Sequence, residues 1–236
     1  MHLISHSLDS SIQKNSGRVF KCLTTLLNAT IALTLAKQQY INVRTFQYDI
    51  NCNGSGSLSD SYEACAPSLF IGEAFYKVGV CVSFNGLPTI FTIQNTEGVF
   101  IIDTTYQDFT CKIPLQYPSV VPQEECINIC SANPTVVSIV DEIVKSPANS
   151  YTEVSYAGSC NGNWKSNFNA IEYTLTNTCV NNPDGSTFTK CNSTDIVSKV
   201  TTFYECHLWE GTADSQTGAD CGTEGGFNTF RFCGNQ

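Results

Sequence analysis

The stretches YDINCNG at residues 48–54 and YAGSCNG at residues 156–162 share the pattern Tyr-x-x-x-Cys-Asn-Gly. They begin 108 positions apart in a chain of 236 residues. Weaker versions of the pattern, an aromatic residue shortly before a cysteine, occur at 106–111 and 202–206. A motif that recurs at a long separation is typical of proteins built from repeated units. The sequence therefore predicts two tandem modules, each opened by one of the two stretches.

Cysteine spacing extends this repeat over the rest of the chain. When Cys22 is set aside, the other twelve of the thirteen cysteines fall into four units of three, and an aromatic residue precedes the first cysteine of each unit. The units are Cys52, Cys65 and Cys81; Cys111, Cys126 and Cys130; Cys160, Cys179 and Cys191; and Cys206, Cys221 and Cys233. An even total is what a disulfide framework requires. The alternative is that the grouping into threes is accidental and that only the two-fold repeat is real.

A unit of three cysteines cannot pair all of its own thiols, so neighbouring units must share bridges. We expect the first two cysteines of each unit to close a local loop, and the third to join a neighbouring unit. The expected bridges are Cys52–Cys65, Cys111–Cys126, Cys160–Cys179, Cys206–Cys221, Cys81–Cys130 and Cys191–Cys233. A bridge that closes a loop of about 15 residues contributes about 3 kcal/mol in the chain-entropy model. Several bridges would therefore rival the net stability of a domain, about 5–15 kcal/mol.

Strand signals are stronger than helix signals along the chain. Residues 40–50 are rich in β-branched and aromatic side chains, which favour strands. Residues 88–94 and 99–106 flank a four-residue connection that ends at Gly98, a pattern that predicts a β-hairpin. Residues 171–175 alternate between apolar and polar side chains, the period of a half-buried strand. The sequence therefore predicts an all-β fold of two tandem, small, disulfide-stapled β modules that are sandwich-like, each built from two units of three cysteines.

The segment 134–145 has apolar residues at helix-like spacing, but its β-branched content favours a strand. We interpret it as the last strand of the first module or as a short connecting element, followed by a linker. The predicted organisation is an upstream segment plus signal peptide at 1–36, a first cysteine-rich β module at 37–147 and a second at 148–236.

Residues 18–36 have the composition of a secretory signal peptide. Basic residues lie at the start, a mostly apolar run follows, and Ala36 is small enough for cleavage. The alternative is a buried or membrane-anchoring apolar helix. Removal of the segment would also remove Cys22 and leave twelve cysteines. We expect a secreted, extracellular mature protein without a membrane span, glycosylated at the sequons that begin at Asn53 and Asn192.

The composition of the chain limits its partners. Charged residues make up only 14% of the sequence, and the formal net charge is −9. Nucleic acids and anionic membrane surfaces attract clustered Lys and Arg side chains, which this sequence lacks. We therefore expect an extracellular ligand, either a glycan or a protein, and no nucleic acid.

No sequence motif points to catalysis, a metal or a cofactor. The three histidines are His2, His6 and His207, and the first two precede the expected cleavage site. A catalytic triad would therefore need His207, which directly follows Cys206 and needs no role beyond a surface position. The sequence has no Cys-x-x-Cys pair, and its acidic residues lack the spacing of a calcium loop. We expect no enzymatic activity, no metal and no cofactor.

The two tryptophans are the candidate ligand-binding residues. Trp164 and Trp209 follow the opening cysteines of the third and fourth units within polar stretches, and Asn163 precedes the first of them. An indole ring can stack on the CH face of a sugar while neighbouring amides bind its hydroxyls. These residues therefore form a candidate carbohydrate site. The alternative is that each ring packs against a disulfide or fills the base of a loop.

The opening motif resembles that of secreted cysteine-rich tandem-repeat proteins found in amoebozoan genomes. The residues that carry the resemblance are Tyr48, Cys52, Gly54, Tyr156, Cys160 and Gly162. Proteins of this kind mostly have no assigned activity, so the resemblance implies an extracellular context and no particular function. The function we expect is that of a secreted extracellular binding or matrix protein, with carbohydrate as one candidate ligand. The alternatives are a secreted effector, such as a protease inhibitor or a signalling protein, and a secreted hydrolase.

Overall fold

The computed structural model describes most of the chain after residue 36. The described residues are 37–48, 61–95, 97–128, 132–156, 160, 167–191, 195–201, 206, 213–217, 222–224 and 227–233. Contacts divide the chain into two units, Met1–Gln38 and Gln39–Gln236, and the sheets described below belong to the second. The expected signal peptide lies outside the described residues. No helix within the described ranges has the length and apolar character needed to cross a bilayer.

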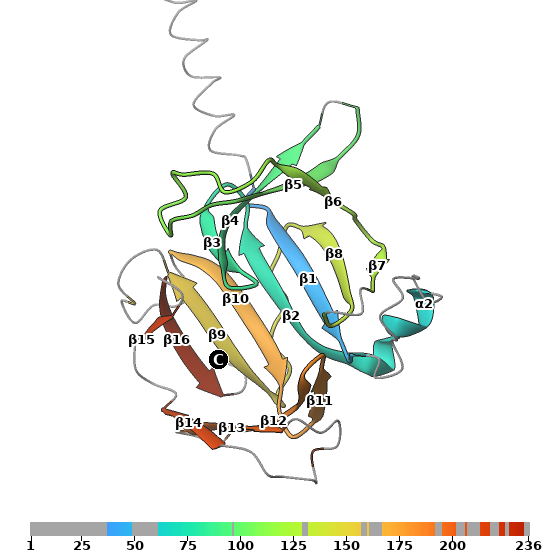
Figure 1. The fold of residues 1–236 in the computed structure, drawn as a ribbon, viewed down its shortest axis with the longest axis vertical. Coiled ribbons are helices and arrows are strands. Elements are labelled where there is room, and N and C mark those ends of the chain that lie inside the picture. The colour runs from blue at the N-terminus through green and yellow to red at the C-terminus, as the bar shows by residue number, and fades with distance from the viewer. Residues whose placement is uncertain are drawn as a thin grey trace, which may run out of the picture. The chain divides into compact units, whose positions relative to one another are not determined.

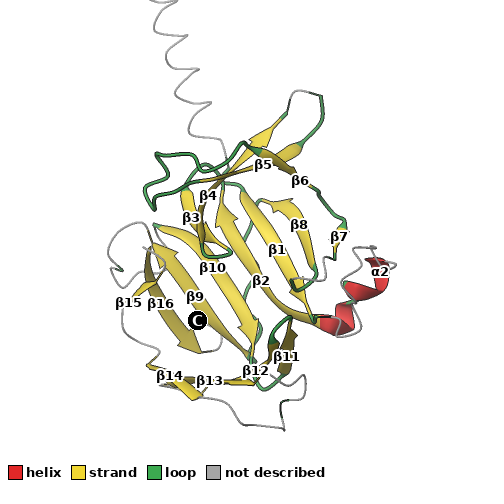
Figure 2. Ribbon diagram, viewed as in Figure 1, coloured by secondary structure: helices red, strands yellow, loops and turns green. Residues whose placement is uncertain are grey.

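The fold is all-β, as the sequence predicts (Figure 2). The helical elements of the described residues, α2 (Ser61–Ala64) and the 3-10 turn η1 (Pro67–Leu69), both lie between β1 and β2. The strands are β1 (Tyr40–Phe46), β2 (Phe70–Lys77), β3 (Cys81–Phe84), β4 (Leu87–Gln94), β5 (Phe100–Thr105), β6 (Ser119–Val121), β7 (Cys126–Ile127), β8 (Thr135–Val140), β9 (Ser150–Tyr156), β10 (Phe168–Leu175), β11 (Cys179–Asn182), β12 (Gly185–Cys191), β13 (Asp195–Thr201), β14 (Ala213–Thr217), β15 (Gly222–Glu224) and β16 (Phe227–Cys233).

The strand predictions from the sequence are confirmed. The expected strand at 40–50 is β1, and the expected hairpin consists of β4 and β5, which pair antiparallel. The alternating residues 171–175 belong to β10. The ambiguous segment 134–145 contains the strand β8, in keeping with its β-branched residues.

Three sheets make up the described fold. The large sheet has eight strands in the order β15-β16-β9-β10-β2-β1-β8-β7. The first small sheet has the order β3-β4-β5-β6, and the second small sheet has the order β11-β12-β13-β14. Figure 1 shows the two small sheets near opposite ends of the large sheet.

The strand order of the first half of the chain recurs in the second half. Each half begins with two neighbouring strands of the large sheet, continues with a four-stranded small sheet, and returns to the large sheet with two more strands. The halves meet where β2 pairs antiparallel with β10. The division into two modules at residue 147 stays a prediction, because strands from both sides of that residue share the large sheet.

The strands that join the two halves approach each other closely. A Cβ atom built at Gly72 of β2 would lie only 2.4 Å from the carbonyl oxygen of Tyr173 in β10. No real Cβ atom tolerates such a distance to a backbone atom, so a side chain at this position would force the strands apart. Glycine at position 72 therefore allows the two halves to form one sheet.

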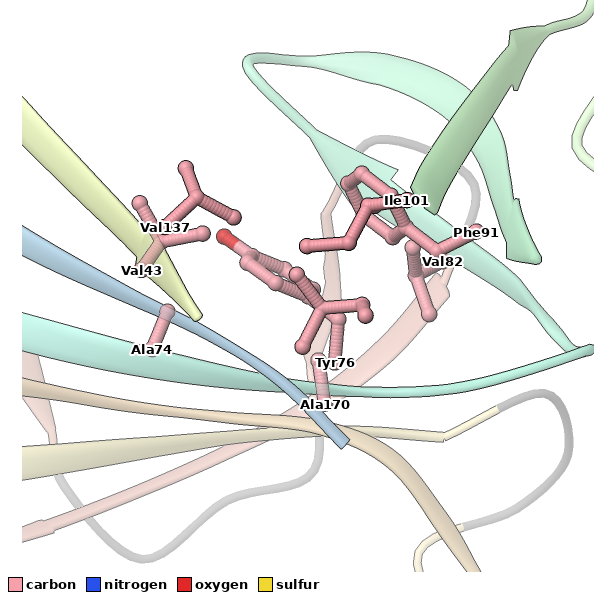
Figure 3. Packing of buried hydrophobic residues seen from close by; sticks show 9 residues of the cluster. Val43, Ala74, Tyr76, Val82, Phe91, Ile101, Val137 and Ala170 are labelled. Atoms are coloured by element: carbon pink, nitrogen blue, oxygen red, sulfur yellow. The ribbon is translucent and has the colours of Figure 1, made fainter. Parts of the chain in front are cut away.

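The two faces of the large sheet carry separate apolar cores, because successive side chains of a strand point to opposite faces. One face is here called the groove face, because the groove described below lies over it. On this face Tyr76 packs with Val82, Phe91 and Ile101 of the first small sheet (Figure 3), and Ile41 belongs to the same core. The second core is formed by Phe75, Val154, Phe168, Ile171, Tyr173 and Phe232. The central strands are therefore buried on both faces.

Four disulfide bridges join described cysteines, and Cys160 is disulfide-bonded as well. The bridges are Cys65–Cys126, Cys81–Cys111, Cys179–Cys206 and Cys191–Cys233. The Cα–Cα distances are 5.7–5.8 Å, within the usual range of about 4.4–6.8 Å. In both small sheets, a cysteine at the start of the first strand is bonded to a cysteine between the third and fourth strands.

The expected pairing is confirmed for Cys191–Cys233 and wrong for the other bridges that can be compared. The expected Cys52–Cys65 and Cys111–Cys126 bridges are wrong because Cys65 is bonded to Cys126, and Cys81–Cys130 is wrong because Cys81 is bonded to Cys111. The expected Cys160–Cys179 and Cys206–Cys221 bridges are also wrong, since Cys179 is bonded to Cys206. The bridges join cysteines that are 27 to 61 positions apart, from strands and loops that only the folded chain brings together. The remaining cysteines, Cys22, Cys52, Cys130 and Cys221, lie outside the described residues.

Candidate functional site

A groove lies over the groove face, between the first small sheet and the β11–β12 turn. Its volume is about 950 Å³, at the upper end of the range of roughly 300–1,000 Å³ for ligand pockets. Strands β1, β2, β8 and β10 contribute to its floor. One wall carries Phe84, Asp103 and Val120 of the first small sheet, and the other carries Pro183 and Asp184 of the turn. Both halves of the chain therefore build the groove.

A tyrosine and a glutamate from the two central strands form the polar part of the floor. The hydroxyl of Tyr76 in β2 donates a hydrogen bond of 2.9 Å to the carboxylate of Glu172 in β10. Burial and the neighbouring Glu153 raise the pKa of Glu172 to about 7, although the Tyr76 hydrogen bond and Arg231 oppose the shift. Burial and the Glu172 carboxylate also raise the pKa of Tyr76 well above its ordinary value. Glu172 is therefore a carboxyl group that exchanges its proton near neutral pH.

An ion pair next to Glu172 continues the polar row across the large sheet. The row follows the strand register. Glu172 of β10 lies opposite Ala74 of β2 on one side and Glu153 of β9 on the other, and Glu153 lies opposite Arg231 of β16. The Nε atom of Arg231 donates to the carboxylate of Glu153, and both side chains are about one-fifth exposed. Because this arginine is paired with Glu153, its stabilising effect on the Glu172 carboxylate is only partial.

The groove is acidic. Asp103 on β5 accepts a hydrogen bond from the Ser119 hydroxyl, and Asp184 is exposed in the β11–β12 turn. The carboxylate of Glu73 accepts a hydrogen bond of 3.2 Å from Asn42. Glu73 and Asn42 each lie next to residues whose side chains are on the groove face, and side chains alternate between faces along a strand. Their hydrogen bond is therefore on the opposite face of the large sheet. No Lys, Arg or His is among the described residues that line the groove. The groove therefore favours cationic groups over anionic ones.

The residues that the sequence singles out for ligand binding cannot be compared with this groove. Trp164, Trp209 and Asn163 lie outside the described residues, as do His207 and the sequon residues Asn53 and Asn192. The carbohydrate site and the two glycosylation sites stay predictions.

Sequence reasoning missed the groove residues. The alternation of Ile171, Tyr173 and Leu175 places Glu172 on the polar face of its strand, which suggests solvent exposure. A second layer covers that face, so Glu172 is half-buried. Its clearest sequence signal is an acidic residue within a strand otherwise rich in apolar residues, and this signal does not identify Tyr76 as its partner.

The architecture defines the class of protein as an all-β, disulfide-bonded protein whose two halves share one sheet. The chain belongs to the family described as counting factor-associated protein A/B/C, whose model matches residues 19–233. The resemblance to amoebozoan cysteine-rich proteins is therefore confirmed at the level of the family.

Two relatives from Dictyostelium discoideum show how far the similarity extends. Counting factor-associated protein A is 29% identical over 190 residues, which cover 72% of this chain and 81% of the relative. Counting factor-associated protein B is 28% identical over 90 residues, which cover 33% of this chain and 52% of the relative. No solved structure matches the chain.

Proposed function

We propose that this chain is a secreted, non-catalytic binding protein that associates with another extracellular protein. The observation that carries the proposal is its family membership over residues 19–233, because the relatives are named for their association with counting factor. The disulfide bridges support an extracellular location, since such bridges form and persist mainly in oxidising compartments.

The groove supports a binding role because it offers a concave surface with apolar walls and carboxylate groups. Sites with this composition bind ligands through shape and a small number of oriented polar groups. Both halves of the chain contribute to the groove, so the shared large sheet provides a rigid support for it.

Expression of the epitope-tagged full chain in Dictyostelium discoideum cells tests the proposal. We expect the tagged protein in the conditioned medium, and we expect it to co-fractionate with counting factor in gel filtration and in immunoprecipitation. A secreted disulfide-bonded protein of another family, with the same tag, is the control. Retention inside the cells, or elution in the medium only as a free monomer, would contradict the proposal.

Carbohydrate is a second candidate ligand, and it rests on Trp164 and Trp209. We expect a glycan array probed with the oxidised full chain to show binding that the double variant Trp164→Ala/Trp209→Ala loses. Binding that survives both substitutions would remove the tryptophans from the site. The sequon variants Asn53→Gln and Asn192→Gln should each lower the mass of the secreted protein by one glycan.

A further inference from the structure

We propose that the groove binds an extended segment of a partner protein in which Lys or Arg side chains alternate with apolar side chains. The inference rests on the proposed binding function and identifies the site and the chemistry of the bound segment. Three observations support the proposal: the charge of the groove, the unpaired edge of the strand that lines it, and the net charge of the whole chain.

The first feature is charge. Carboxylates line three sides of the groove: Asp103 is on one wall, Glu172 is on the floor, and Asp184 is on the opposite wall. None of the described lining residues is basic. A cationic side chain that enters the groove therefore meets carboxylates on several sides. Hydrogen bonds between ionised partners are roughly twice as strong as neutral ones, which favours Lys or Arg over polar uncharged residues.

The second feature is the edge of the first small sheet. Strand β6 is the last strand in the order β3-β4-β5-β6, so one of its edges has no strand partner among the described residues. Its consecutive residues Val120 and Val121 point to opposite sides of the strand, yet both line the groove. The groove therefore runs along the edge of β6. An extended peptide can add to such an edge through backbone hydrogen bonds.

The exposed side chain of Val120 provides an apolar contact for the added segment. Val120 is 60% exposed, and Phe84 of the same small sheet also faces the groove. Val120 pairs with Ile102, and Asp103 is the next residue along β5, so Val120 and Asp103 point to opposite faces of this sheet. Alternate side chains of an added strand also point to opposite faces, so apolar residues contact Val120 while basic residues reach Asp103. This combination favours an extended peptide over a small amine, which would use the carboxylates alone.

The third feature excludes a second copy of this chain as the preferred partner. The chain has 12 basic residues and 21 acidic residues, so two copies repel each other at their acidic surfaces. A basic segment of a different protein relieves this repulsion and complements the groove.

Fluorescence anisotropy with short labelled peptides tests the proposal on the oxidised full chain at about 0.15 M salt, where distant charges are screened. The probe is a hexapeptide of alternating valine and lysine, and the matched probe has glutamate in place of lysine. We expect the lysine peptide to bind at least about tenfold more tightly than the glutamate peptide. A lysine peptide with methylated backbone amides cannot donate strand hydrogen bonds, so we expect it to bind at least about tenfold more weakly.

Substitutions in the protein locate the binding site. The triple variant Asp103→Asn/Glu172→Gln/Asp184→Asn should weaken binding of the lysine peptide by about tenfold or more. The single variant Asp184→Asn changes only an exposed turn residue, so it should fold normally and weaken binding by a smaller factor. The control Glu97→Gln makes the same change of charge at an exposed residue outside the groove, and it should leave binding unchanged.

A pH series gives an independent readout. The groups that act on Glu172 are Tyr76, Glu153 and Arg231, and Tyr151 lies within its electrostatic reach. A bound Lys requires the ionised form of Glu172, whose pKa is about 7, so binding should weaken by up to about tenfold from pH 8 to pH 6. The variant Glu172→Gln should lose this dependence.

Three results would overturn the inference: equal binding of the lysine and glutamate peptides, equal binding by the triple variant, or no binding of the lysine peptide at millimolar concentration. If the peptide fails while the full chain still co-fractionates with counting factor, only the groove is rejected as the site. If the chain also fails to associate with any protein in the medium, the proposed function is rejected as well.

Discussion

The two small sheets have similar strand orders, but the contacts that attach them to the large sheet differ among the residues that the structure describes. The first is attached by an apolar core, in which Phe91 packs against Tyr76 and Phe84 at ring distances of 5.6 and 5.1 Å. The second is joined by the Cys191–Cys233 bridge between β12 and β16. The side-chain amides of Gln47, which directly follows β1, and of Asn133 also form hydrogen bonds with the backbone of β11. One topology can therefore be stabilised by packing in one half and by covalent and polar contacts in the other.

Removal of the central ring of the first core should have the largest effect. Phe91 is 1% exposed, so Phe91→Ala should lower the free energy of unfolding by about 3–5 kcal/mol. Urea denaturation measures the loss, and hydrogen exchange should show earlier opening of β3–β6 than of β11–β14. The matched control Phe100→Ala removes a ring that is 39% exposed, and it should cost much less. Equal costs for the two variants would contradict a packed core at Phe91.

Removal of the bridge should weaken the second half selectively. The double variant Cys191→Ser/Cys233→Ser opens a bridge between residues 42 positions apart and should cost about 2–4 kcal/mol. Hydrogen exchange should increase in β11–β14 and stay unchanged in β3–β6. The control Cys81→Ser/Cys111→Ser should show the reverse pattern. If both variants loosen the same strands, the small sheets are not attached independently.

Both halves of the chain form the floor of the groove, and the free energy of unfolding should depend on pH through Glu172 in this floor. The folded-state pKa of Glu172, about 7, is above its ordinary value of 4.5, so the native state retains a proton that the unfolded state has lost. This group therefore lowers stability as pH rises from about 4.5 to 7, by at most about 3 kcal/mol. Glu172→Gln should stabilise the protein at pH 8 and have little effect near pH 4. Urea midpoints at the two pH values measure the difference, and an equal effect at both would contradict the shifted pKa.

The polar attachment of the second small sheet should give the smallest effect. The amide of Gln47 donates a hydrogen bond of 2.7 Å to the carbonyl of Cys179 and accepts one of 2.7 Å from the backbone N–H of Asn181. Gln47→Ala leaves both groups without this partner and should cost about 1–2 kcal/mol, measured by urea denaturation. Gln94→Ala, at an exposed position of β4, should cost less than about 0.5 kcal/mol. A Gln47 variant as stable as the Gln94 variant would show that these bonds contribute nothing.

Local sequence patterns predicted strands and one hairpin, but not the pairing of strands that are distant in sequence. Alternation and β-branched residues located β1, the β4–β5 hairpin and β8, because these signals depend on side chains close in sequence. The bridge between Cys65 and Cys126 depends on two segments 61 positions apart, which spacing alone could not pair. For the same reason the groove was missed, since its floor combines Tyr76 with a glutamate 96 positions away.

Peptide mapping of the secreted protein by mass spectrometry without reduction tests the shared-sheet architecture most directly. This architecture predicts linked peptides for Cys65–Cys126, Cys81–Cys111, Cys179–Cys206 and Cys191–Cys233. Peptides that link Cys111 to Cys126, or Cys206 to Cys221, would contradict it, because each of these links would replace bridges that this arrangement of the sheets contains.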